Sequence, residues 1–200
     1  MARAGFPASL VLGLAGGVGS GKSQVAELLR SRGATVVDAD ALGHRAIDEP
    51  EVRRRLVRAW GPIILKGNRI DRGSLAKVAF GSRASVRRLN GIVHPAILRH
   101  MRRRLALRRG WVVLDAALLY EVGADRLCDR VIFVDAPRRL RERRIRGRGW
   151  ARGELKRRER FQWTVAYKKK KADYVLVNTG TLSDTEHRLD KILHDLRRSI

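Results

Sequence analysis

Gly16-Gly-Val-Gly-Ser-Gly-Lys-Ser23 is the most informative segment of this 200-residue chain. Its glycines, lysine and serine have the spacing of a loop that wraps around a phosphate chain. Glycine lets successive backbone N–H groups point at one phosphate, and a helix beginning near Lys22 adds the positive end of its dipole. In such a loop Lys22 bridges the two outer phosphates and the Ser23 hydroxyl ligates Mg²⁺. The segment therefore predicts a site for ATP and magnesium.

The flanking residues provide the structural context that such a loop needs. Residues 10–14 form a short apolar run that is typical of a buried parallel strand. After the loop, apolar side chains recur at helical spacing from Val25 to Leu29, and Gly33 suits the end of that helix. A strand, a glycine loop and an amphipathic helix in this order argue against a simple tight turn.

Four more strand-like runs follow, separated by helical patterns. They cover residues 35–38, 111–115, 130–135 and 174–178. Strands that alternate with helices imply a parallel sheet. We therefore predict an α/β protein with a P-loop kinase fold, in which helices flank a five-stranded parallel sheet. The last helix is expected to begin at the capping-box pattern from Ser183 to Glu186.

The same pattern divides one predicted domain into a core, an insertion and a lid. The core comprises about residues 8–40, 111–137 and 172–200. The insertion, about residues 41–110, is helical and strongly basic. The lid, about residues 138–171, is rich in arginine, with twelve basic and three acidic residues between 138 and 160. Such an arm is expected to move and to bring guanidinium groups to the transferred phosphate.

Acidic residues follow the predicted strands on the side of the sheet where ligands gather. Asp38 and Asp40 lie at and just beyond the end of the second strand, and either carboxylate fits the role of a base toward the acceptor. The alternative is that one of them caps the helix beginning near Ala41. Asp115 ends another strand, where it either helps to hold Mg²⁺ through water or belongs to a turn.

The charge of the chain is unusual. Lys and Arg number 44 against 20 Asp and Glu, which gives a formal net charge of +24. Such a surface attracts polyanions, and non-specific nucleic-acid binding is expected at low salt. Aromatic residues make up only 6% of the chain, which leaves few platforms for stacked bases. A composition biased toward arginine, with a site for heavily phosphorylated ligands, is the favoured explanation.

Composition also bears on the compartment and the assembly. The sequence contains no apolar run long enough for a membrane helix, and residues 1–20 lead into the glycine loop rather than to a cleavage site. The single cysteine, Cys128, cannot form an internal disulfide and is expected to fill core space. We predict a cytoplasmic protein without membrane contact, either a monomer or a weak oligomer.

Spaced motifs along nearly the whole chain together resemble the dephospho-coenzyme A kinase family. The glycine loop from residue 13 is followed by Val37-Asp-Ala-Asp40 and His44. The remaining motifs are Asp71-Arg-Gly-Ser-Leu75 with Phe80, Leu89-Asn90 with His94-Pro95, Asp115 with Leu118-Leu119 and Glu121, and Gln162, Lys168, Ala172-Asp173 and Asn178. The glycine loop alone indicates only a superfamily, whereas the spaced set is much more specific.

The resemblance implies that ATP phosphorylates the ribose 3′-hydroxyl of dephospho-coenzyme A, the last step of coenzyme A biosynthesis. It implies that Asp40 is the general base, that Lys22 is catalytic, and that Arg143 is the catalytic lid arginine with Arg148 as a second candidate. It also implies that the insertion is the lobe that binds the acceptor. The nucleotide-binding residues that it implies are Gly16, Gly17, Val18, Gly19, Ser20, Gly21, Lys22, Ser23 and Gln24.

Substrate-binding roles fall on Asp38, His94 and Asp115. A structural role is an equal alternative for His94, because a lone histidine before proline is often structural. The chain also departs from the family pattern, which leaves the fit of adenine and acceptor open. The departures are Ala15, Gln24, Ala116, Ala117 and Leu140.

Two other functions remain compatible with the glycine loop. One is a P-loop kinase for a nucleoside, a nucleotide or another small metabolite, which would share the loop and lid but differ in the insertion. The other is a nucleotide-dependent protein associated with nucleic acid, suggested by the basic surface. A GTPase is disfavoured because the sequence lacks an Asn-Lys-x-Asp guanine-reading motif.

Overall fold

The computed structural model describes residues 6, 10–107 and 110–199. Residues 8, 9, 108, 109 and 200, which belong to the predicted core and insertion, lie outside the described residues, as does most of the segment before the first strand. Internal contacts divide the chain into two compact units. The first comprises Met1–Asp38 and Leu105–Ile200, and the second comprises Ala39–Arg104.

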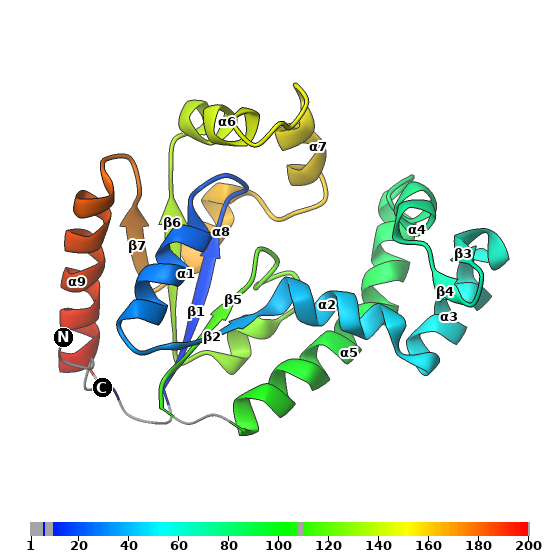
Figure 1. The fold of residues 1–200 in the computed structure, drawn as a ribbon, viewed down its shortest axis with the longest axis horizontal. Helices are drawn as coiled ribbons and strands as arrows, with labels where there is room; N and C mark the ends of the chain where they lie inside the picture. Colours follow the sequence, from blue (N-terminus) through cyan, green and yellow to red (C-terminus); the bar gives the residue numbers. More distant parts are fainter. Residues whose placement is uncertain (1–5, 7–9, 108–109, 200) are drawn as a thin grey trace. The chain divides into compact units, whose positions relative to one another are not determined.

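The first unit is built on a five-stranded sheet, drawn in Figure 1. Its strands are β1 (Val11–Gly16), β2 (Thr35–Asp38), β5 (Val112–Asp115), β6 (Arg130–Asp135) and β7 (Tyr174–Val177). The order is β2-β5-β1-β6-β7, and every neighbouring pair is parallel. The prediction of a five-stranded parallel sheet is therefore confirmed.

The central strand is apolar because both of its faces are covered. All six residues of β1 are buried. Leu12 and Leu14 pack into a core with residues of the neighbouring strands and with helices α1 (Lys22–Ser31) and α9 (Leu182–Arg198). Helix α8 (Val165–Lys171) packs against β1 and β6, and Figure 1 shows it behind the sheet while α1 lies in front. Burial on both faces explains the continuous apolar run.

Helix α9 begins two residues earlier than the sequence pattern predicts. The N-cap is Thr181, whose hydroxyl accepts from Asp184 N while the Asp184 carboxylate accepts from Thr181 N at 2.7 Å. These bonds hold the pKa of Asp184 below its usual range. The predicted box at Ser183 and Glu186 was wrong, because aspartate takes the place of the usual Glu or Gln three residues after the N-cap.

The Arg-rich arm consists of three helices. Helices α6 (Arg138–Arg146) and α7 (Glu154–Glu159) precede α8. Outside the arm, a short 3-10 turn, η2 (Ala124–Leu127), lies between β5 and β6. Ile145 and Leu155 are the buried apolar residues of α6 and α7. Two apolar anchors among many cations explain why the sequence shows little apolar periodicity here.

The second unit is mostly helical and has its own core. Its elements are α2 (Ala39–Asp48), α3 (Pro50–Trp60), η1 (Pro62–Ile64), β3 (Leu65–Lys66), β4 (Arg69–Ile70), α4 (Arg72–Ala79) and α5 (Arg83–Ala106). Val52, Leu56 and Ile64 are among the residues buried in this core. The antiparallel pair β3 and β4 was not predicted. No helix within the described residues is long and apolar enough to cross a membrane.

Candidate active site

The predicted phosphate loop connects β1 to α1 at the carboxyl end of the sheet. Gly19 and Gly21 have φ values of 77° and 94°, a left-handed backbone that favours glycine. The loop closes on itself through one backbone bond, from Ser20 N to Gly17 O at 3.0 Å. The amides of Gly19, Gly21, Lys22 and Ser23 donate to no protein acceptor within residues 6, 10–107 and 110–199. Four unused N–H groups at a helix N-terminus form an anion cradle.

Close packing behind the loop leaves no room for side chains at its glycines. A Cβ on Gly17 would lie 3.0 Å from Arg141 Nη1, and one on Gly19 would lie 2.9 Å from Arg141 O. A Cβ on Gly21 would collide with the side-chain amide of Asn178. Gly19 and Gly21 are therefore required by both backbone conformation and contact.

The carbonyl oxygens of the loop are held by donors from outside it. Arg141 Nη1 donates to Val18 O at 3.1 Å, and Arg144 Nη1 donates to Ser20 O at 2.9 Å. Asn178 Nδ2 also donates to Ser20 O, at 2.9 Å. Because these bonds hold the carbonyls on the outer side, the amides remain available to a bound anion.

An acidic residue at a strand end and the loop lysine meet beside the loop. Asp38 and Asp115 are register partners at the ends of β2 and β5. Lys22 Nζ donates to the carboxylate of Asp115 in a largely buried ion pair. The structure thus brings Lys22 and Asp115 together, while Ser23 and Gln24 are exposed in the first turn of α1.

Asp40 and His94 belong to the second unit. Asp40 lies in the first turn of α2, only two residues after Asp38 along the chain. His94 precedes Pro95 in the interior of α5. The roles of Asp40 and His94 toward bound substrates stay predictions.

The two lid arginines chosen from the sequence, Arg143 and Arg148, are exposed. Arg141 and Arg144 are instead the α6 residues that contact the loop. Burial and the nearby charges of Arg143 and Arg148 lower the pKa of Arg144. Arg141 and Arg144 were not predicted from the sequence. Their spacing of three, next to the apolar Ile145, is the signal that places them on the inward face of α6.

Lys168 matches a position of the family motif, and its contacts in the structure are those of a residue that stabilises the fold. The residue is 1% exposed. Its Nζ lies 2.7 Å from Glu121 Oε1, 3.1 Å from Ala117 O and 3.2 Å from Gln162 Oε1. Lys168 therefore ties α8 to the segment that follows β5.

The central strand of this parallel sheet runs into the glycine loop, and the lysine of the following helix lies beside the acidic residue that ends a neighbouring strand. This arrangement defines a P-loop kinase. A family model described as dephospho-CoA kinase matches residues 10–184. The chain belongs to the dephospho-CoA kinase family.

Individual relatives agree with this assignment. The chain is 42% identical to a dephospho-CoA kinase of Deinococcus radiodurans, over 92% of this chain and 91% of the relative. A crystal structure of a Thermus thermophilus protein is 38% identical and superposes with a TM-score of 0.80 over 94% of this chain and 97% of that one. A shikimate kinase of Acinetobacter baumannii, 14% identical with a TM-score of 0.55 over 93% of each chain, shares the fold.

Proposed function

We propose that this enzyme transfers the γ-phosphoryl group of ATP to the ribose 3′-hydroxyl of dephospho-coenzyme A, forming coenzyme A and ADP. Membership of the family supports the acceptor. The observation that carries the proposal for the donor is the set of four unused amides between Gly19 and Ser23. Backbone N–H groups in this arrangement bind the phosphates of a nucleotide.

Lys22 is the proposed cation for the outer phosphates. In the structure its ammonium group is bound to the Asp115 carboxylate, so a bound triphosphate replaces or joins that carboxylate as the partner of Lys22. The loop from Gly16 to Gln24 then surrounds the phosphate chain. Lys22 would neutralise charge that spreads over the transferred group.

The side chains around the loop suit Mg²⁺. The exposed Ser23 hydroxyl and the Asp115 carboxylate offer the oxygen ligands that Mg²⁺ prefers, with Asp115 reaching the ion directly or through water. Within the described residues, no group of three His, Cys, Asp or Glu side chains forms a metal site on its own. This fits an ion held chiefly by the nucleotide. When bound, Mg²⁺ supplies charge neutralisation between the phosphates.

Asp40 is the proposed general base. Its carboxylate would take the proton of the ribose 3′-hydroxyl as the oxygen forms a bond to the γ-phosphorus. The bond from that phosphorus to the β–γ bridging oxygen breaks, and ADP leaves. Asp38 and His94 are proposed to bind the acceptor, within or beside the insertion at about residues 41–110.

The arm at about residues 138–171 is the proposed lid. Arg143 and Arg148 are exposed, so they are free to turn toward a bound nucleotide, whereas Arg141 and Arg144 keep the loop in shape. We further propose a cytoplasmic location, a monomeric or weakly associated state, and non-specific attraction of polyanions by the net charge of +24.

The test is an ATP-consumption assay over a panel of acceptors. The panel contains dephospho-coenzyme A, adenosine, AMP, shikimate and gluconate. We expect ADP formation only with dephospho-coenzyme A, and phosphorus NMR of the product should show a new 3′-phosphate. Faster turnover of any other acceptor, or a phosphate at the 2′-position, would refute the proposal.

A further inference from the structure

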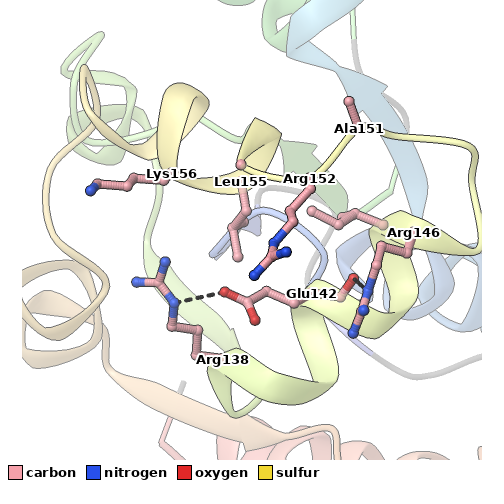
Figure 2. A pocket seen from close by; sticks show the side chains of 9 residues that line it. Arg138, Glu142, Arg146, Ala151, Arg152, Leu155 and Lys156 are labelled. Carbon is pink, nitrogen blue, oxygen red and sulfur yellow. Dashed lines mark hydrogen bonds and ion pairs between the residues drawn. The ribbon is translucent and has the colours of Figure 1, made fainter.

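A pocket lies within the Arg-rich arm, between α6 and the start of α7 (Figure 2). Its volume is about 610 Å³, which is within the range of small-molecule sites. The buried side chains of Ile145 and Leu155 form part of its lining. Its cationic lining residues are Arg138, Arg146, Arg152 and Lys156.

The pocket and the glycine loop use different faces of α6. Arg138, Glu142 and Arg146 follow one another at intervals of four residues and therefore share a face, which lines the pocket. Arg141 and Arg144 lie on another face and donate to carbonyls of the glycine loop. The pocket cations are thus separate from those that support the nucleotide site.

The pocket holds more positive charge than its one carboxylate neutralises. Glu142 accepts from Arg138 Nε at 2.9 Å, as drawn in Figure 2. Arg152 and Lys156 have no carboxylate partner in the part of the chain that the structure describes. Figure 2 shows the Arg152 guanidinium extending into the space beside Glu142. Clustered cations attract phosphate, and guanidinium groups match its geometry.

We propose that this pocket binds a chain of linked phosphates at a second site, additional to the ATP site in the glycine loop. The chain would be carried either by a free nucleoside triphosphate or by inorganic polyphosphate. Bound there, it would join the pocket cations of α6 to Arg152 and to Lys156 of α7 and relieve their mutual repulsion, which would hold the two helices together. This goes beyond the proposed kinase reaction and does not depend on the acceptor.

The experiment is isothermal titration calorimetry of the full chain with inorganic triphosphate, at about 0.15 M salt so that distant surface charges are screened. We expect two ions per chain for the wild type and one for the Arg152→Gln/Lys156→Gln variant. The matched control is Arg126→Gln/Lys170→Gln, which removes one exposed arginine and one exposed lysine elsewhere and should keep both sites. Circular dichroism checks that each variant is folded.

A second variant should raise the affinity of the pocket for the second ion, whereas the first variant abolishes its binding. Glu142→Gln removes the one carboxylate of the pocket lining and frees Arg138, so the second ion should bind roughly threefold more tightly. Repeating the titration with ATP tests the nucleotide as the source, since equal occupancy of the second site by ATP and triphosphate means that the base is not recognised.

Two results would overturn the inference. One is saturation of the wild type at a single ion, and the other is an equal loss of the second ion in the pocket variant and in the control pair. Turnover of dephospho-coenzyme A is measured separately. A wild type that turns over but binds one triphosphate refutes only the second site, whereas an inactive wild type that binds two refutes only the kinase proposal.

Discussion

Lys22 is bound to the carboxylate of Asp115, the residue that ends the strand next to β1. Both side chains are about 15% exposed, so the contact is shielded from bulk solvent. The carboxylate holds the ammonium group beside the loop before any phosphate arrives. We therefore expect a bound triphosphate to replace or join the Asp115 carboxylate as the partner of Lys22.

The first prediction concerns this change in the partners of Lys22. Asp115→Asn frees Lys22, so ATP should bind more tightly without Mg²⁺, while the additional affinity that Mg²⁺ provides should fall by about tenfold or more. Calorimetric titration with ATP, with and without Mg²⁺, measures both effects. Asp135→Asn is the matched control, because Asp135 also ends a parallel strand and pairs with Lys169 at 2.6 Å. Equal behaviour of the two variants would contradict the proposed role of Asp115.

The second prediction identifies the base. Asp40→Asn should keep ATP affinity and lower kcat by about 10² to 10⁴-fold, because loss of a general base removes that much acceleration. Asp38→Asn, two residues earlier, should mainly raise KM for the acceptor. Lys22→Ala should weaken both ATP binding and turnover. Full activity of Asp40→Asn would assign proton transfer to another group.

The third prediction separates steric contact from backbone conformation in the loop. Gly21 and Gly33 both have positive φ values, 94° and 91°, but only a Cβ at Gly21 meets another atom, the Asn178 amide. Gly33→Ala should cost about 1–2 kcal/mol of unfolding free energy for the left-handed backbone. Gly21→Ala should cost more and should also abolish ATP binding. Urea denaturation and nucleotide titration test this, and equal costs would mean that the Asn178 side chain moves aside.

The fourth prediction distinguishes support of the loop from catalysis in the lid. Arg144→Gln removes charged donors to Ser20 O and Asn178 O, so it should lower stability by about 1.5–3 kcal/mol and raise KM for ATP. Arg143→Gln removes an exposed group and should lower kcat with stability unchanged. Thermal unfolding and steady-state kinetics of both variants give the comparison. Reversed effects would exchange the two roles.

The fifth prediction concerns Cys128. Burial, with smaller contributions from Asp125, Asp129 and Asp173, raises the pKa of this thiol to about 12. Iodoacetamide at pH 8.5 should therefore alkylate the native protein at least about a hundredfold more slowly than the urea-unfolded chain.

The same pKa shift also has a consequence for stability. Since the thiol ionises more readily when unfolded, its contribution to stability is present below pH 9 and is lost as the pH rises toward 12. Cys128→Ala should flatten the stability curve over that range. Rapid native alkylation, measured by mass spectrometry, would show that the thiol is accessible.

The parts of the fold that the sequence predicts best are those with strong local patterns. The boundaries of β2 and β6 agree with the predicted ranges. The continuous apolar run of β6 marks a strand whose four middle residues are buried, whereas β2 is a partly exposed edge strand. The strands β3 and β4 have two residues each, which is too short for any periodicity to appear. Only the turn between them, at Gly67, is visible in the sequence.

The candidate site also has parts that the sequence predicts and parts that it does not. The glycine loop is evident from spacing alone, since its chemistry depends on consecutive residues. The support provided by Arg141, Arg144 and Asn178 depends on segments far apart in the chain and on which face of α6 turns inward. Among twelve cations in one short stretch, charge cannot single out the two that touch the loop. Their spacing next to Ile145 indicates the inward face of α6, but only the tertiary contacts show that they donate to the loop.

The buried contact between Lys168 and Glu121 restricts which substitutions these two positions can accept during evolution. Removing either charge alone leaves the other without a counterion in a site closed to water, whereas replacing both by apolar groups of similar size is often nearly neutral. Homologous proteins should therefore keep the two residues together or lose them together, and an inherited change at one position should be tolerated only after compensation at the other.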